Sequence, residues 1–249
     1  MFYQLGKCFI AALVWLDMLL ATALLYVLSF LPQKFTKLWY PYLFRSWCWV
    51  FVRALGVSLK LHQKNKNSLP KQFIVIANHP SALEDIGMNA LFKARFLAKE
   101  EIKNWWIFGR ISVAAGTFYV KRESKESRKL ASEALINILS QGYNIGIYPE
   151  GGCKGRRIHL PFQYGTFDAS IKTGVPIVPI FLHYEAQAEF EWRSDESLLQ
   201  KLWKIYKSPN KTANYYVFDA IYPENFKDKE TLCNHVQDLY LQWQDKYLE

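Results

Sequence analysis

Strand-like and helix-like segments alternate along most of this 249-residue chain. Short runs of β-branched and other apolar residues at 73–77, 144–148 and 175–183 are separated by segments with helical spacing of apolar side chains, such as 124–141. Parallel strands need long crossover connections of this kind, because a tight turn joins only antiparallel strands. The alternation therefore predicts an α/β fold, a mainly parallel sheet flanked by helices. Residues 187–214 follow neither pattern clearly.

The N-terminal part is different, because residues 8–31 are almost wholly apolar and Asp17 is their only charge. About 20 such residues are enough for a helix to cross a bilayer. We therefore expect an N-terminal membrane-associated helix, and Lys34 and Lys37 after it favour a cytoplasmic position for the rest of the chain. A cleaved signal peptide is the alternative, since residues 21–23 read Ala-Thr-Ala.

A second hydrophobic stretch, residues 38–59, contains several Trp and Tyr residues and is interrupted by Arg45 and Arg53. Aromatic rings together with long cationic side chains are typical of a helix at the membrane interface. A buried core helix is the alternative. These segments divide the chain into a membrane anchor (1–60), a polar linker (61–72) and a main domain (73–249).

Composition narrows the class of partner. The formal net charge of +9 suits nucleic acid, anionic lipid or phosphorylated substrates, and the abundance of Trp, Phe and Leu favours a lipid surface. No nucleic-acid-reading module is recognisable, so nucleic acid is not an expected partner. The cysteines and histidines show no disulfide or metal-ligand spacing, and no metal is expected. They are Cys8, Cys48, Cys153, Cys233, His62, His79, His159, His183 and His235.

The first predicted strand ends in Asn78-His79, and Glu84 follows five residues after the histidine. Neighbours on one helical face are three or four residues apart, so the two side chains meet only if His79 precedes a helix that Glu84 begins. Ser81 is placed to cap that helix, with Glu84 completing a capping box. An imidazole held by a carboxylate is a general base. A capped turn with an ordinary surface histidine is the alternative.

Three further motifs follow in the chain: Gly-Thr-Phe-Tyr-Val-Lys-Arg at 116–122, Tyr-Pro-Glu-Gly-Gly-Cys at 148–153 and Val-Pro-Ile-Val-Pro-Ile at 175–180. With Asn78–Glu84 they resemble, in order and spacing, the four blocks of the glycerolipid acyltransferase family, which includes the 1-acylglycerol-3-phosphate acyltransferases. Those blocks are N-H-x-S-x-x-D, G-x-x-F-x-x-R, F-P-E-G-T-R and V-P-I-V-P. The resemblance covers about residues 73–185.

The resemblance implies transfer of a fatty acyl group from acyl-CoA or acyl carrier protein to the free hydroxyl of a lysophospholipid. The expected acceptor is 1-acylglycerol 3-phosphate, which would give phosphatidic acid at the cytoplasmic membrane, with no bound cofactor. His79 would be the base and Glu84 its carboxylate, with neighbouring Asp85 as the alternative partner. Arg122 would bind a phosphate of acceptor or donor, and Glu150 with the following glycines would bind the acceptor.

The third motif departs from the family, because Gly151 is followed by Gly152-Cys153 instead of Thr-Arg. The missing arginine is the one credited with the acceptor phosphate. Lys154, Arg156 and Arg157 could supply that charge from displaced positions. Otherwise the acceptor is a lysophospholipid with a head group or a lyso-aminolipid. A covalent acyl group on Cys153 is a minor alternative.

Two other classes of protein are alternatives to a lysophospholipid acyltransferase. A lipase or thioesterase would need a Gly-x-Ser-x-Gly elbow, and the chain has none. A catalytically inactive membrane-binding protein on the same scaffold is the second alternative, supported by the altered third motif and by Glu84 where the family has Asp.

Overall fold

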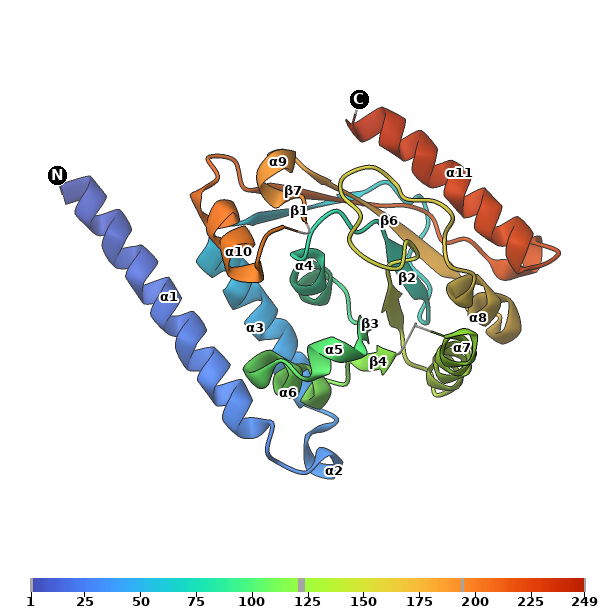
Figure 1. The fold of residues 1–249 in the computed structure, drawn as a ribbon, viewed down its shortest axis with the longest axis horizontal. Coiled ribbons are helices and arrows are strands. Elements are labelled where there is room, and N and C mark those ends of the chain that lie inside the picture. Colours follow the sequence, from blue (N-terminus) through green and yellow to red (C-terminus); the bar gives the residue numbers. More distant parts are fainter. Residues whose placement is uncertain (1, 121–123, 194, 249) are drawn as a thin grey trace.

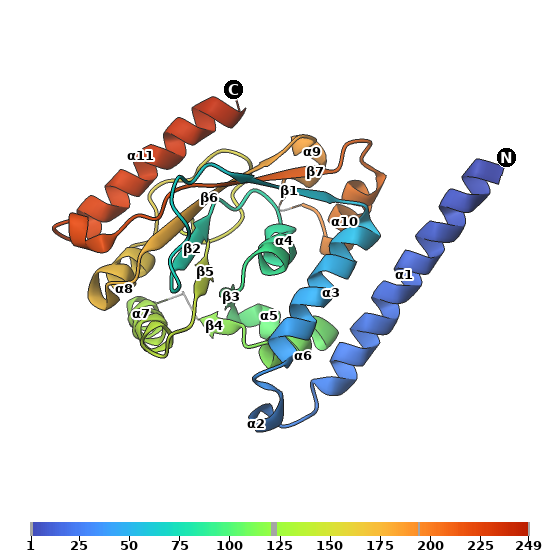
Figure 2. The same ribbon diagram turned by 180° about the vertical axis from the view of Figure 1, so that it is seen from behind.

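The computed structural model describes residues 2–120, 124–193 and 195–248. These residues form a seven-stranded sheet in the order β1-β7-β6-β2-β5-β3-β4, with helices on both faces (Figures 1 and 2). The strands are β1 (Ser58–Gln63), β2 (Ile74–Ala77), β3 (Arg95–Lys99), β4 (Phe118–Val120), β5 (Ile145–Ile147), β6 (Ile177–Tyr184) and β7 (Thr212–Val217).

The predicted fold class is confirmed. Strands β4, β3, β5, β2 and β6 are parallel to one another, β7 is antiparallel to β6, and β1 is parallel to β7. All four residues of β2 are buried, as expected for a central parallel strand covered on both faces. Strands β1 and β7, at one edge of the sheet, run opposite to the other five.

Side chains along β2 alternate between the two faces of the sheet and pack into two hydrophobic cores, one on each face. Val75 and Ala77 belong to the core shared with α3 (Tyr40–Leu55) and α4 (Glu84–Leu91). Ile74 and Ile76 belong to the other core, which lies under α7 (Lys125–Ser140), α8 (Gly165–Thr173) and α11 (Lys229–Leu248). The remaining short elements are α2 (Gln33–Thr36), α5 (Glu100–Lys103), α6 (Trp106–Ala114) and η1 (Pro223–Asn225).

The apolar N-terminal segment is a helix, α1 (Phe2–Leu28), whose residues Phe9–Leu28 are long and apolar enough to cross a membrane. The inner face of α3 is buried, as the alternative of a core helix predicted, and the interfacial position of its exposed face stays a prediction. The inner face packs into the core against α4, and Arg45 donates hydrogen bonds to the carbonyls of Ala90 and Leu91 at 2.9 and 3.0 Å. The arginine thus binds the end of α4, where exposed carbonyls attract a cation, and not a lipid phosphate.

Residues 58–63, expected to lie partly in the anchor and partly in the linker, form β1 at the sheet edge, paired with β7. Most of its side chains are exposed, and its sequence is therefore as polar as that of a linker. The sheet therefore begins before the predicted linker, and the wider division into anchor and main domain stays a prediction.

The segment 187–214 resolves into α9 (Gln187–Phe190), α10 (Leu198–Lys207) and the start of β7. A capping box between Ser197 and Gln200 begins α10. This helix lies beside α1, where the rings of Trp15 and Tyr206 meet edge to face at 5.7 Å.

Candidate active site

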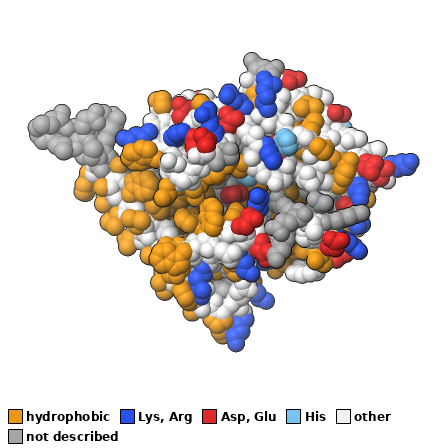
Figure 3. Space-filling view, viewed as in Figure 1, with side chains coloured by type: hydrophobic (Ala, Val, Ile, Leu, Met, Phe, Trp, Pro, Cys, Tyr) orange, Lys and Arg blue, Asp and Glu red, His pale blue; other side chains and the backbone are white. Residues whose placement is uncertain are grey.

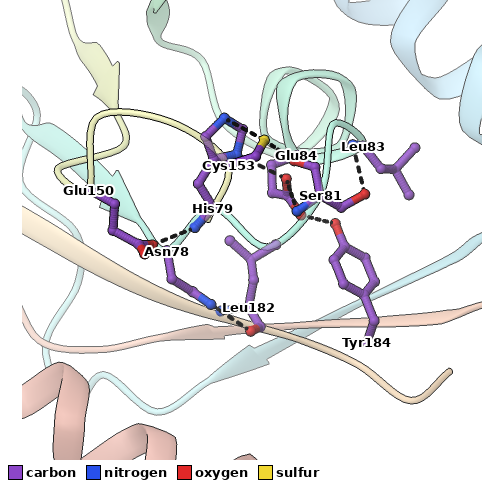
Figure 4. A network of polar contacts seen from close by, with 9 residues as sticks. All are labelled: Asn78, His79, Ser81, Leu83, Glu84, Glu150, Cys153, Leu182 and Tyr184. Carbon is purple, nitrogen blue, oxygen red and sulfur yellow. Dashed lines mark hydrogen bonds and ion pairs between the residues drawn. The ribbon is translucent and has the colours of Figure 1, made fainter. Parts of the chain in front are cut away.

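His79 follows β2 in the middle of the sheet, at the carboxyl end of the parallel strands where α/β proteins commonly bind ligands. The Asn78 side chain continues the pairing of β2 with β6 by one step. Its Nδ2 donates to the carbonyl of Leu182 at 3.0 Å, and its Oδ1 accepts from the Leu182 amide at 2.6 Å. The chain is thus fixed at Asn78 and turns away from the sheet at His79 (Figure 4).

Glu84 is the carboxylate that meets His79, with 3.0 Å between Nδ1 and Oε2. It is the first residue of α4, as the spacing predicted. His79 is only 8% exposed and Glu84 is fully buried, so the alternative of a surface histidine is wrong. Asp85, the alternative partner, lines an apolar cavity beside the helix.

Glu84 accepts two further hydrogen bonds, from the Ser81 amide at 3.0 Å and from the Tyr184 hydroxyl at 2.5 Å. The predicted cap is only half present, because α4 begins after Leu83 and the Ser81 hydroxyl accepts from the Leu83 amide. Burial raises the pKa of Glu84 to about 8, and the hydrogen bonds from Tyr184 and Ser81 oppose that rise. The three donors hold the carboxylate in one orientation.

The other ring nitrogen, Nε2 of His79, lies 3.2 Å from Sγ of Cys153. The same sulfur is 3.1 Å from the carbonyl of Ser81, to which its thiol donates. Burial raises the pKa of the Cys153 thiol, which therefore stays protonated. Cys153, His79 and Glu84 thus stand in a row (Figure 4), with the thiol at hydrogen-bond distance from Nε2. A covalent role of Cys153 stays a prediction.

Potential metal-ligand atoms of His79, Glu84 and Cys153 lie within 4.8 Å of one another. Each of these residues already forms a hydrogen bond within the protein. His79 bonds to Glu84, Glu84 accepts from Tyr184, and Cys153 donates to the Ser81 carbonyl. The three residues thus satisfy one another and their neighbours by hydrogen bonds. The absence of a metal stays a prediction.

Glu150, just after β5, is buried and binds two backbone amides. Its Oε1 accepts from the His79 amide at 2.8 Å and its Oε2 from the His159 amide at 2.9 Å. Burial raises the pKa of Glu150 to about 7, opposed by the hydrogen bonds from His159 and His79. The carboxylate therefore positions the backbone of His79, a role that the sequence did not indicate, and its acceptor-binding role stays a prediction.

Tyr148 also supports the imidazole. Its ring stacks on that of His79, with centroids 4.0 Å apart and planes 12° apart. Gly151, two residues before Cys153, has φ of +80°, a left-handed conformation that favours glycine. This turn carries the chain from Tyr148 to Cys153, so that both residues contact the same imidazole.

Two cavities flank this network, and Leu97 borders both. The cavity that we call polar has a volume of about 540 Å³ and a mixed lining, in which Glu150, Lys154 and His159 accompany apolar residues such as Leu135 and Ile147. The apolar cavity, of about 160 Å³, is lined mainly by hydrophobic side chains, including Leu83, Phe96, Phe108, Leu198 and Leu202.

The three predicted cations of the loop after β5, Lys154, Arg156 and Arg157, together line a surface hollow of about 430 Å³. Lys154 also lines the polar cavity, and Arg156 pairs with Glu191 at 3.3 Å. Gly152 is partly exposed within the same loop. Arg122 lies outside the described residues.

The family model described as Acyltransferase matches residues 59–183, half of the chain. The 1-acyl-sn-glycerol-3-phosphate acyltransferase of Neisseria gonorrhoeae is 31% identical over 115 residues, which are 46% of this chain and 45% of that protein. The match thus spans less than half of that relative. The lyso-ornithine lipid O-acyltransferase of Pseudomonas aeruginosa is 26% identical over 214 residues, 83% of this chain and 77% of that protein.

Among solved structures, the 1-acyl-sn-glycerophosphate (LPA) acyltransferase PlsC of Thermotoga maritima has the same fold, with a TM-score of 0.64. The two chains are 16% identical, and the match covers 98% of this chain and 96% of the other. The similarity extends over the N-terminal helices as well as the sheet.

Proposed function

We propose, from the premise that the chain belongs to the acyltransferase family, that it transfers a fatty acyl group from an acyl thioester to the free hydroxyl of a lysophospholipid. The observation that carries the proposal is the buried pair of His79 and Glu84, 3.0 Å apart at the end of β2. This pair supplies what ester formation from a hydroxyl needs, a base of fixed orientation in a site with little water.

In the proposed reaction, Nε2 of His79 removes the proton of the acceptor hydroxyl while its oxygen attacks the thioester carbonyl carbon. The imidazolium that forms is stabilised by Glu84 at Nδ1 and by the face of the Tyr148 ring. The tetrahedral intermediate collapses, the carbon–sulfur bond breaks, and the leaving thiolate takes the proton from His79. The acceptor hydroxyl takes the position at Nε2 that the Cys153 thiol occupies.

Acyl-CoA and acyl carrier protein are both proposed donors, because each is an anionic acyl thioester and the chain carries a net charge of +9. The apolar cavity beside Leu83 is the candidate place for the acyl chain. The apolar helix α1 supports an assignment to the membrane, with Lys34 and Lys37 favouring a cytoplasmic active site.

For the acceptor we propose 1-acylglycerol 3-phosphate, which would give phosphatidic acid. Lys154 in the polar cavity and the name of the Neisseria relative support it. A lyso-aminolipid is the second candidate, because the relative matched over 83% of this chain is a lyso-ornithine lipid acyltransferase. Cys153, where the family pattern has a phosphate-binding arginine, favours the same alternative.

The test is transfer of a radiolabelled acyl group by the purified full chain in detergent. Acyl-CoA and acyl carrier protein are each paired with 1-acylglycerol 3-phosphate, lysophosphatidylcholine and lyso-ornithine lipid. We expect transfer to 1-acylglycerol 3-phosphate to be fastest, and His79→Ala to lower turnover by about 10²- to 10⁴-fold.

His62→Ala is the matched control, because His62 also stacks on a tyrosine, Tyr216, but lies on the edge strand β1. Faster transfer to a headgroup-bearing or amino lysolipid would replace the proposed acceptor. Lipid binding without transfer to any acceptor would favour the inactive scaffold. Undiminished turnover in His79→Ala would remove the proposed base.

A further inference from the structure

We propose that the main domain carries a second membrane-contact surface on both sides of the apolar cavity. It consists of Leu199 and Trp203 on the outer face of α10, and of Trp105 and Trp106 where α5 leads into α6. We call these four residues the second contact surface, and its occupant is the lipid of the leaflet that holds α1.

Helix α10 has apolar side chains on two faces. Leu198 and Leu202 line the apolar cavity, whereas Leu199 and Trp203, four residues apart on the neighbouring outward face, are 78% and 59% exposed. A helix on the surface of a soluble domain normally turns polar side chains outward. Trp106, near the other side of the cavity, is 81% exposed. Such large aromatic and aliphatic side chains are stable in this position when a lipid phase covers them.

The second contact surface continues the apolar face of α1. Trp15 of α1 meets Tyr206 of α10, and Phe30 just after α1 lies 3.5 Å beneath the guanidinium of Arg110 in α6. Because α10 touches α1 within its apolar length, lipid that covers α1 reaches the main domain. Figure 3 shows hydrophobic side chains gathered on the side of the molecule that carries α1, α6 and α10.

Cations border this apolar surface. Lys204 and Lys207 on α10 are exposed, and Lys207 lies 4.8 Å from the centre of the Trp203 ring. Lys103 and Arg110 are exposed on either side of Trp106. Acidic groups offset part of this charge, because Lys204 also contacts Glu196, and Glu100 and Glu101 lie in α5. Apolar side chains in the centre with cations around them fit the acyl layer and the anionic head groups of a leaflet.

Both halves of the second contact surface belong to elements that also line the cavity: α10 through Leu198 and Leu202, and the α5–α6 region through Trp105 and Phe108. If both halves of the second contact surface touch the leaflet, the apolar cavity between them lies at the depth of the lipid acyl chains. A substrate chain could then pass between bilayer and cavity without exposure to water.

The test uses the full wild-type chain in vesicles of phosphatidylcholine and phosphatidylglycerol that contain a phospholipid with a diazirine along one acyl chain. After irradiation, labelled residues are located by mass spectrometry. We expect label on 198–207 and 105–108 as well as on α1, and none on α7. Label confined to α1 would overturn the proposal. The experiment needs no turnover, so its failure is distinct from failure of the proposed acyltransferase function.

A pair of variants tests the consequence. Leu199→Glu/Trp203→Glu removes the apolar outer face of α10, and Leu130→Glu is the matched control, a leucine 65% exposed on α7. With lysolipid in vesicles we expect the double variant to lose about tenfold in kcat/KM, because two side chains no longer enter lipid. With lysolipid in detergent micelles it should equal wild type, as should Leu130→Glu in both assays. Equal losses in vesicles and micelles would indicate misfolding of α10 and would contradict a lipid-contact role. Full activity of the double variant in vesicles would contradict it as well.

Discussion

The turn after β2 and the loop after β5 meet at His79, yet they keep to the family pattern to different degrees. The first, residues 78–84, departs from it only by Glu84 for Asp, and its polar groups are tied to α4 and β6. The second, residues 148–157, keeps Pro149, Glu150 and Gly151 but replaces the Thr-Arg pair. Its three cations line one surface hollow, from which Lys154 also reaches the polar cavity.

The difference separates two tasks of the proposed enzyme. The first region fixes a base, a requirement common to every hydroxyl acceptor. The second region has two functions. Glu150 and Tyr148 hold the base in place, and other groups of the loop line the polar cavity. Substitutions in the first region should therefore lower turnover with every acceptor, whereas those in the outer part of the second should change preference among acceptors.

The largest effect is expected for Glu84→Gln. The amide removes the charge that stabilises the imidazolium and presents an N–H group where Glu84 accepts three hydrogen bonds. By analogy with the carboxylate of a catalytic triad, kcat should fall by about 10²- to 10⁴-fold for all acceptors. Asp85→Asn on the same helix is the matched control, and a greater loss in that variant would make Asp85 the partner of His79.

Glu150→Gln should lower kcat by about 10- to 100-fold, because one backbone amide, of His79 or His159, faces an amide donor in place of an oxygen. KM should change little if Glu150 only positions His79. An acceptor-specific rise in KM would instead give Glu150 the contact with acceptor that the family resemblance implies.

The same variant tests the pH dependence. Burial raises the pKa of Glu150 from 4.5 to about 7, so the folded state binds its proton more tightly than the unfolded state. The free energy of unfolding of wild type should therefore fall as pH rises between these two values, and Glu150→Gln should flatten part of that slope. Thermal unfolding in detergent across this range measures it.

Tyr184→Phe removes one donor to Glu84 and leaves the ring. We expect kcat to fall by about 3- to 10-fold, the cost of one hydrogen bond of ordinary net strength. Because the Tyr184 hydroxyl lowers the pKa of Glu84, the rise of activity with pH should also move to higher pH. A loss without that movement would indicate disturbed packing of Tyr184 on Phe190, on which its ring stacks.

Lys154→Ala should raise KM about fivefold for 1-acylglycerol 3-phosphate, because an exposed cation contributes modestly to binding a phosphate. The change for lysophosphatidylcholine should be smaller, since its phosphate is a diester with a cationic head group. Equal changes in KM for both acceptors would indicate that Lys154 binds the donor.

The smallest effect is expected for Cys153→Ala. If the thiol only occupies the position at Nε2 that the acceptor hydroxyl takes, kcat should stay within about twofold of wild type, since surface and weak contacts seldom cost more. Loss of activity together with an acyl group on wild-type Cys153 that hydroxylamine removes would establish the covalent alternative.

The sequence predicts those parts of the molecule that depend on local spacing. The parallel sheet follows from alternating patterns, and the contact of His79 with Glu84 follows from five residues that span a helix start. Tyr184 was not predicted, because it reaches Glu84 from 100 residues away and nothing near it marks a polar partner.

The same limit applies to segments whose composition fits two environments. The aromatic and cationic pattern of α3 suits a membrane interface, yet Arg45 binds the carbonyl end of α4 and the inner face is buried. Likewise the polar residues of β1 suit a linker, and only the partner strand β7, about 150 residues later, makes them a strand. Long-range contacts decide both cases.

Asn78 has a consequence for how this chain can diverge. Its amide pairs with both backbone groups of Leu182, giving one hydrogen bond and accepting another. Aspartate lacks the donor, leucine lacks both groups, and glutamine carries them one methylene too far. Of the twenty side chains, only asparagine can form both hydrogen bonds to Leu182 here. We therefore expect this position to stay unchanged while neighbouring surface residues vary. A substitution there, at a residue with no proposed contact to substrate, should be as harmful to descendants of this sequence as loss of the histidine beside it.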